Sequence, residues 1–284
     1  MKRSASKIAL ALAVILAVVP FAQGAGPVVL KTTEFGSGPT IVLVHGLGQG
    51  RLSWMPTARK LLSNYHVVMV DLPGHGDSPL PDPFSLEASA EALDQVVAKQ
   101  KPDSTLLVGS GVGGLLAMMS ASAHPTHQRG LVMIDVALKS PVPIEDQQKK
   151  MFYDFMEQNY DQFLHMTFGR MGRDSTQSVA IHAMASQVPP NTMKAYFRSL
   201  LDVDGTKALK ELKTPMLPVF TEKLLASDKD WPTLSKSIGW ENAAAYTPRR
   251  IAGAGMLVAT EQPDTLAAVL AAFATRTLAA PAKK

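Results

Sequence analysis

Short apolar runs alternate with helical patterns along most of this chain. The helical patterns repeat their apolar residues at the 3.6-residue spacing, as at 51–63 and 85–99. The apolar runs are almost continuous, which is typical of strands that are buried on both faces. The predicted strands are 40–45, 65–71, 105–109, 131–135, 216–220 and a weaker one near Ile251. Because helices separate these strands, we predict an α/β fold with a doubly wound, mostly parallel sheet.

The segment 138–213 interrupts this alternation. Its pattern is helical and rich in methionine and aromatic residues, most of which suit an ordinary helical core. The flexible thioethers and flat rings of a few of them also suit the wall of an apolar ligand pocket. We therefore predict a helical lid over 138–213, inserted into a core made of 25–137 and 214–278. We expect the tail at 279–284 to be frayed.

The first 24 residues have the pattern of an export signal. Three basic side chains precede an apolar run from Ile8 to Val19, and small residues at Ala22 and Gly24 suit a signal peptidase. The run is about 12 residues long, which is short of the roughly 20 that span a bilayer. We predict a cleaved signal peptide over 1–24, a periplasmic or secreted mature chain and no stable membrane span. A retained anchor is the alternative.

Charge and cysteine content exclude several classes of partner and site. The formal net charge is +4, and three basic residues of 1–24 account for most of it. No basic stripe with interleaved aromatic residues occurs elsewhere, so we expect no nucleic-acid partner. The chain has no cysteine. Disulfides, thiolate metal ligands, a cysteine nucleophile and a lipid anchor on an N-terminal cysteine are therefore excluded.

Glycine-rich turns follow the predicted strands at four places. They are 45–48 (HGLG), 71–78 (DLPGHGDS), 108–114 (VGSGVGG) and 253–256 (GAGM). In this order and spacing they resemble the turns of the α/β-hydrolase family, in its lid-bearing esterase and peptidase-like branch. The resemblance covers nearly the whole mature chain, and it implies the α/β-hydrolase fold with a lid.

The resemblance also implies where a site would form. Ligands of open α/β sheets bind at the carboxyl ends of the strands, where these turns lie. In the family, two backbone N–H groups form the oxyanion hole. The matching positions here are Leu47 and Val112. The residues expected in the pocket turns are His45, Gly46, Gly109, Ser110 and Gly113.

This chain departs from the family at the triad positions. The family elbow Gly-x-Ser-x-Gly has Gly111 in place of its serine, and Gly111 has no side chain to attack a substrate. Met256 occupies the position of the histidine and cannot accept a proton. Leu224 occupies the usual position of the acid. The fallback residues are Ser110, which lies one residue before the elbow position, and Asp135, which ends the next strand.

From these residues we expect no ordinary Ser–His–Asp hydrolysis, and whether the chain is an enzyme stays uncertain at this point. The first interpretation is a non-catalytic pseudo-hydrolase with a degenerate triad. It would bind a small apolar molecule or a protein partner between lid and sheet. The alternative is a weak or unconventional hydrolase that acts on an ester-like or amide-like substrate through the surviving oxyanion hole.

The same glycines permit a second alternative. Gly109, Gly111 and Gly114 match the pattern Gly-x-Gly-x-x-Gly, which follows a strand and opens a helix. Asp135 follows at roughly the spacing of the acid that binds a ribose hydroxyl in dinucleotide-binding units. Such a unit normally begins a domain, whereas two strands with hydrolase-type turns precede this one. We therefore expect no cofactor.

The histidines offer two further possibilities. His45, His75 and Asp77 could hold a metal ion for metal-dependent hydrolysis, but the chain has no HExxH motif or comparable ligand cluster. We therefore expect no metal. His165 or His182 could swing from the lid toward the pocket as a base. A place on a helix surface is the simpler expectation for both.

Overall fold

The computed structural model describes residues 28–140, 144–243 and 246–278. The expected signal peptide at 1–24 and the expected frayed tail at 279–284 lie outside these residues. Both therefore stay predictions, as does the location of the mature chain. Within the described ranges, no helix is long and apolar enough to cross a membrane.

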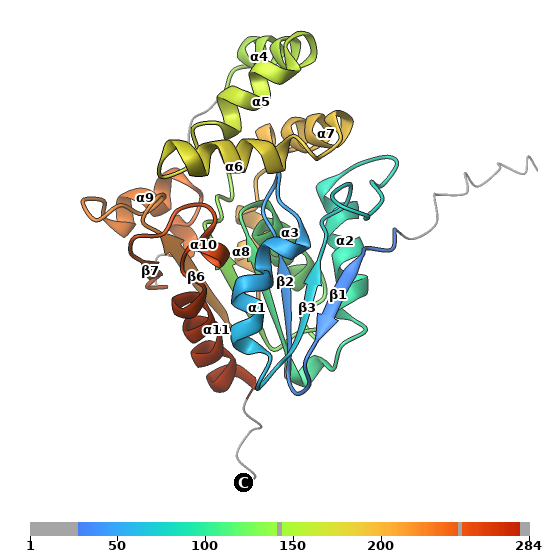
Figure 1. Ribbon diagram of the computed structural model, residues 1–284, viewed down its shortest axis with the longest axis vertical. Helices are drawn as coiled ribbons and strands as arrows, with labels where there is room; N and C mark the ends of the chain where they lie inside the picture. Colours follow the sequence, from blue (N-terminus) through green and yellow to red (C-terminus); the bar gives the residue numbers. More distant parts are fainter. Residues whose placement is uncertain (1–27, 141–143, 244–245, 279–284) are drawn as a thin grey trace, which may run out of the picture.

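A seven-stranded sheet forms the centre of the molecule (Figure 1). Its order is β1-β3-β2-β4-β5-β6-β7, and all neighbours pair in parallel except β1 and β3. The strands are β1 (Thr32–Phe35), β2 (Thr40–Val44), β3 (His66–Val70), β4 (Thr105–Ser110), β5 (Gly130–Ile134), β6 (Met216–Thr221) and β7 (Arg249–Ile251). The predicted doubly wound, mostly parallel sheet is confirmed. The edge strand β1 was not predicted.

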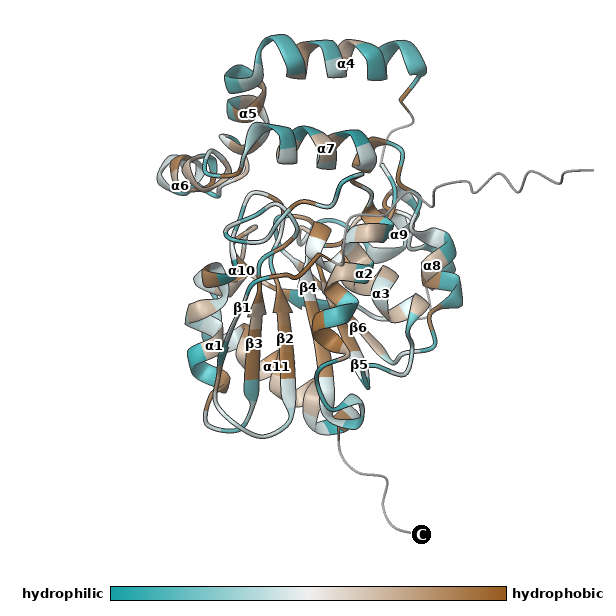
Figure 2. Ribbon diagram, turned by 90° about the vertical axis from the view of Figure 1, so that its right-hand side faces the viewer, coloured by the Kyte–Doolittle hydropathy of each residue, from teal (hydrophilic) through white to brown (hydrophobic). Residues whose placement is uncertain are grey.

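Helices cover both faces of the sheet, and this explains the continuous apolar runs. Ile41 and Leu43 of β2 face one layer, while Val42 and Val44 face the other. The first layer contains η1 (Arg51–Trp54), α1 (Met55–Leu61), α10 (Val258–Glu261) and α11 (Pro263–Leu278). The second contains α2 (Leu86–Val97), α3 (Val112–Ala123), α8 (Thr206–Glu211) and α9 (Trp231–Ser237). The single turns η2 (Pro102–Ser104) and η3 (Glu241–Ala243) lie in connections. Figure 2 shows the strands between the two layers as mostly hydrophobic.

Four helices between β5 and β6 lie beyond the carboxyl ends of the strands (Figures 1 and 2). We call them the helical insertion: α4 (Asp146–Gln158), α5 (Tyr160–Phe168), α6 (Ser175–Ala185) and α7 (Pro190–Leu201). Phe168, Ala185 and Met193 belong to its small apolar core, and Leu47 of the sheet turns packs against that core. Helix α8 also falls within 138–213, but its buried Leu209 belongs to the core of the second layer.

Candidate active site

The turn between β4 and α3 has the backbone conformation of a nucleophile elbow. Gly111 lies at this junction with φ 51° and ψ −121°, in the region that glycine adopts most easily. Ser110 is still part of β4 and pairs with Ile134 of β5. The elbow position is therefore Gly111, as the ungapped comparison with Gly-x-Ser-x-Gly implies, and Ser110 does not occupy it.

The glycines of this turn differ in what surrounds them. A Cβ atom added to Gly113 would lie 2.2 Å from the carbonyl oxygen of His45, so close packing of α3 on β2 requires glycine there. A Cβ atom on Gly111 would meet only the Cα of Gly46, at 4.0 Å. The space beside Gly111 is thus open toward the turn after β2, where the family has its serine side chain.

A small cavity of about 210 Å³ occupies this end of the sheet. Its lower wall comes from the strand-end turns and its cover from the helical insertion. The lining residues are Gly46, Leu47, Gln49, Ser110, Gly111, Val112, Asp135, Phe168, Met171, Phe197 and Met256. His45, Gly109 and Gly113 belong to the same turns but do not themselves line the cavity. Leu224 does not line it either, because its side chain packs against the core of the second layer.

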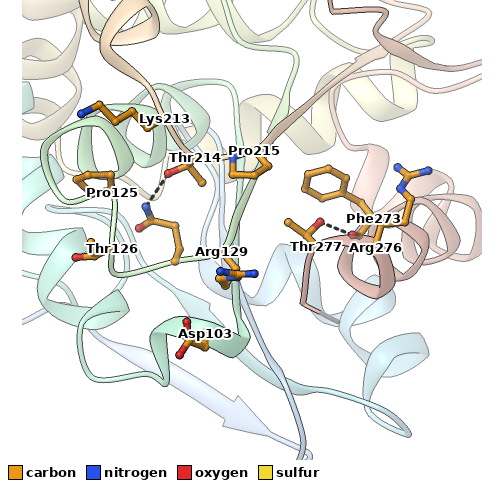
Figure 3. A pocket seen from close by; sticks show the side chains of 11 residues that line it. Asp103, Pro125, Thr126, Arg129, Lys213, Thr214, Pro215, Phe273, Arg276 and Thr277 are labelled. Carbon is orange, nitrogen blue, oxygen red and sulfur yellow. Dashed lines mark hydrogen bonds between the residues drawn. The ribbon is translucent and has the colours of Figure 1, made fainter. Parts of the chain in front are cut away.

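A larger hollow of about 640 Å³ lies at the opposite end of the sheet. Arg129 and Pro215, which line it, directly precede β5 and β6, so it opens at the amino ends of the strands. Figure 3 shows its charged side chains spread apart around the rim, without a common focus. Since sites of parallel sheets form at the carboxyl ends, the smaller cavity is the candidate active site.

Two backbone N–H groups without acceptors indicate an oxyanion hole. Leu47 and Val112 both line the cavity, and in the described parts of the chain neither N–H has a hydrogen-bond acceptor. Val112 is the first residue of α3, so its N–H is one of those that a helix leaves unsatisfied at its start. Two free donors beside an elbow can stabilise the negative oxygen that forms when a carbonyl is attacked.

Buried histidines hold the turn of Leu47 in place. His45 Nε2 accepts the N–H of Leu72 at 3.0 Å, and His75 Nε2 accepts the N–H of Gly48 at 3.3 Å. Burial lowers the pKa of His45 to about 3 and that of His75 to about 4, so both rings are neutral at pH 7. Because both Nε2 atoms accept backbone N–H groups and Asp77 pairs with Arg51, these residues form no metal site.

Asp135 is the acidic group of the cavity. It follows β5 with φ 51°, a conformation that aspartate tolerates better than most residues. Its Oδ1 accepts the N–H of Thr221 at 2.8 Å and its Oδ2 accepts the Thr221 hydroxyl at 2.6 Å. Burial raises the pKa of Asp135 to about 6, although both hydrogen bonds oppose that shift, while the charge of Glu261 adds to it. Asp135 can therefore exchange a proton near neutral pH.

The turn that carries Met256 is held by a second buried carboxylate. Glu261 accepts the N–H groups of Gly255 and of Leu257, the latter at 3.1 Å. The same side chain pairs with Arg173 at 3.2 Å and accepts from Gln177 at 2.7 Å, and both of these partners belong to the helical insertion. Glu261 thus joins the last turn of the site to the insertion. Sequence reasoning noted Glu261 beside the last family-like turn but gave it no role.

The two histidines of the helical insertion do not reach the cavity. His165 of α5 is exposed, and its ring stacks edge-on with His182 of α6 at 5.3 Å. Neither residue lines the cavity. Their positions agree with the simpler expectation that both lie on helix surfaces. Gln49, which does line the cavity, was missed because no motif singles out a glutamine five residues past the end of β2.

The sheet order, the elbow and the free N–H pair are those of an α/β-hydrolase. The model of the alpha/beta hydrolase family matches residues 41–269. The chain therefore belongs to the alpha/beta hydrolase family, and the resemblance in the sequence is confirmed.

Solved structures agree on the fold. A hydrolase from Oleispira antarctica superposes with a TM-score of 0.71 at 17% identity, over 86% of this chain and 94% of that one. A thermophilic esterase from Thermogutta terrifontis gives 0.70 at 19%, over 87% and 93%.

Closer relatives in sequence carry the name pimeloyl-[acyl-carrier protein] methyl ester esterase. The protein of Pseudoalteromonas atlantica is 38% identical over 112 residues, which are 39% of this chain and 42% of that protein. The protein of Vibrio atlanticus is 30% identical over 200 residues, 65% of this chain and 76% of that protein. The match thus spans less than half of the first relative and about three quarters of the second.

These relatives contradict the first interpretation of the sequence. A secreted, non-catalytic pseudoenzyme with a degenerate triad does not fit a chain whose relatives are named as esterases. The error lay in equating the absence of a Ser–His pair with the absence of chemistry. The dinucleotide alternative also loses its basis, because its glycines and Asp135 lie within the residues that the alpha/beta hydrolase family model matches. The hydrolase alternative is the one that remains.

Proposed function

We propose that the protein hydrolyses carboxylic esters in this cavity by direct attack of water. One observation carries the proposal: Leu47 and Val112, whose N–H groups have no partner in the described residues, and the partly buried Asp135, whose pKa is raised, line the same small cavity beside an elbow without a side chain. The first two features supply an oxyanion hole and a base. The third leaves room for water where the family has its serine.

The oxyanion hole acts on the carbonyl oxygen of the ester. Leu47 and Val112 donate their N–H groups to this oxygen, and the bonds strengthen as negative charge develops on it. The dipole of α3 adds to the effect because Val112 begins that helix. The neutral rings of His45 and His75 fix the turn of Leu47 without placing a competing charge nearby.

Asp135 handles the proton. Its carboxylate removes a proton from the water molecule as the water oxygen bonds to the carbonyl carbon. The tetrahedral intermediate then expels the alcohol oxygen, which takes the proton back from Asp135. One water is consumed, the ester C–O bond breaks, and a carboxylic acid and an alcohol leave. The two bonds from Thr221 orient the carboxylate and leave its remaining lone pairs for the water.

The cavity supports a substrate with a small ester group on an apolar chain. Its volume of about 210 Å³ is below the roughly 300–1,000 Å³ of sites that enclose a drug-sized ligand. Phe168, Met171 and Phe197 give its cover an apolar surface. The names of the relatives point the same way, and we infer methyl esters of aliphatic carboxylic acids as the substrate class.

The pH dependence of hydrolysis tests the proposal. Asp135 must be deprotonated to act as a base, so kcat/KM should rise with pH through about 6 and then level off, because burial raises the pKa of Asp135 to about 6. The assay uses the purified protein with short-chain methyl and p-nitrophenyl esters, corrected for spontaneous hydrolysis. No hydrolysis of any of these esters, or a rate that does not change between pH 4.5 and 7.5, would contradict it.

A further inference from the structure

Four metal-ligating side chains gather on the second helical layer, at the end of α3 away from the candidate active site. Glu91 and Asp94 lie one turn apart on α2. His124 directly follows the last residue of α3 as its C-cap, and His127 lies three residues further on. The pairs Glu91-x-x-Asp94 and His124-x-x-His127 are about 30 residues apart in the sequence. The packing of α2 on α3 brings them together.

The distances within this group suit a metal ion. His127 Nδ1 lies 3.0 Å from both oxygens of Asp94, His124 Nε2 lies 2.9 Å from Glu91 Oε2, and His124 Nε2 lies 3.8 Å from Asp94 Oδ2. Ligand atoms of Asp94, His124 and His127 all lie within 4.8 Å of one another, and Glu91 lies outside this three-residue group and approaches it at His124. Tetrahedral Zn²⁺ bonds of about 2.0–2.1 Å place ligand atoms roughly 3.3 Å apart. The observed separations lie on both sides of that value.

Burial and charge favour a cation at the same point. Asp94 is 3% exposed, and a buried carboxylate needs a compensating partner. In the described ranges its ion-pair partners are the two histidines, with no lysine or arginine, and its remaining polar contact is the Ser120 hydroxyl at 3.3 Å. The rings of His124 and His127 are stacked at 5.2 Å, nearly parallel at 5°, and about one third exposed. Solvent therefore reaches part of both rings.

We propose that Glu91, Asp94, His124 and His127 form a zinc site that joins α2 to the end of α3. Two imidazole nitrogens and two carboxylate oxygens are a ligand set that zinc accepts. Helix α3 has 12 residues and is roughly 18 Å long. The site therefore lies too far from the elbow to take part in ester chemistry, and its role is to hold the layer together. Sequence reasoning predicted no metal site here, because neither the pair Glu91 and Asp94 nor the pair His124 and His127 is specific enough by itself to indicate one.

Zinc titration of the metal-free protein tests the site. The full chain, without added histidines, is treated with a chelator and titrated with Zn²⁺ against a competing chromophoric ligand. We expect one Zn²⁺ per chain and an increase in Tm on binding, because the metal binds the folded state. The variant H124Q/H127Q should bind at least about 100-fold more weakly. The matched control is H165Q/H182Q, which removes the other close histidine pair and should bind as the parent does.

Chemical protection of the histidines gives a readout that needs no variant. Diethyl pyrocarbonate acylates exposed imidazoles, and bound Zn²⁺ should slow its reaction at His124 and His127 while His165 and His182 react at unchanged rates. Lack of zinc binding by the parent chain would overturn the proposal. So would full binding by a folded H124Q/H127Q variant, or protection of the other pair. None of these outcomes depends on the proposed ester chemistry.

Discussion

Replacement of Asp135 by asparagine should lower kcat/KM for ester hydrolysis by about 100-fold or more. General bases contribute roughly 10²–10⁴-fold to such reactions, and the amide of asparagine cannot take the proton from water. The rise of activity through pH 6 should disappear in the same variant, since Asp135 is the group whose pKa burial raises to about 6. Steady-state kinetics from pH 5 to 8 measure both effects.

The stability of this variant separates catalysis from folding. The pKa of Asp135 is about 6 in the folded protein against 3.8 as its ordinary value. The folded state therefore binds more protons than the unfolded chain between about pH 4 and 6, and ionisation of Asp135 lowers the free energy of unfolding across that window. D135N removes the buried charge and should be at least as stable at pH 7. The control D103N changes an exposed aspartate at the other end of the sheet. A D135N protein with parental activity would contradict the role of Asp135.

Removal of the Val112 N–H should cost about 100- to 1,000-fold in kcat. V112P deletes this donor without adding a polar group, and loss of one oxyanion-hole donor has an effect of that size in other hydrolases. Proline is tolerated here because Val112 is the first residue of α3, where the N–H has no partner within the helix. The expected change lies mainly in kcat, because the bond strengthens as the oxyanion forms.

The matched control keeps the backbone donor and shortens the side chain. V112A should retain kcat within a few-fold, and the circular dichroism of both variants should match that of the parent. Equal activity of V112P and V112A would show that this N–H does not contact the reacting oxygen. A large loss in both would instead assign the effect to packing of the Val112 side chain against the second layer, which it contacts.

The central sheet could be predicted from the sequence because its strands are buried on both faces. β2, β4 and β5 are almost fully buried, and their apolar runs are therefore continuous. β1 was not predicted, because Thr32–Phe35 is a short, partly exposed edge strand of mixed sequence. Its place depends on pairing with β3, which is a long-range contact that local pattern does not encode.

The wall of the cavity was predicted better than its chemistry. Glycine spacing identified the elbow at Gly111 and the turn at Leu47, because tight turns leave a local signature. The properties that make Asp135 a candidate base, its burial and its bonds to Thr221, come from β6, more than 80 residues further along the chain. The role of Glu261 could not be predicted for the same reason. Its partners Arg173 and Gln177 belong to the helical insertion.

Isotope transfer in a single turnover tests the central claim most directly. Excess protein is mixed with a methyl ester in H₂¹⁸O, and the acid product and the protein are analysed by mass spectrometry. Direct attack by water predicts one ¹⁸O atom in the acid from the first turnover, with no ¹⁸O in the protein and no acyl adduct. An acyl adduct on Ser110, or an unlabelled acid together with ¹⁸O in the peptide that holds Asp135, would contradict direct attack.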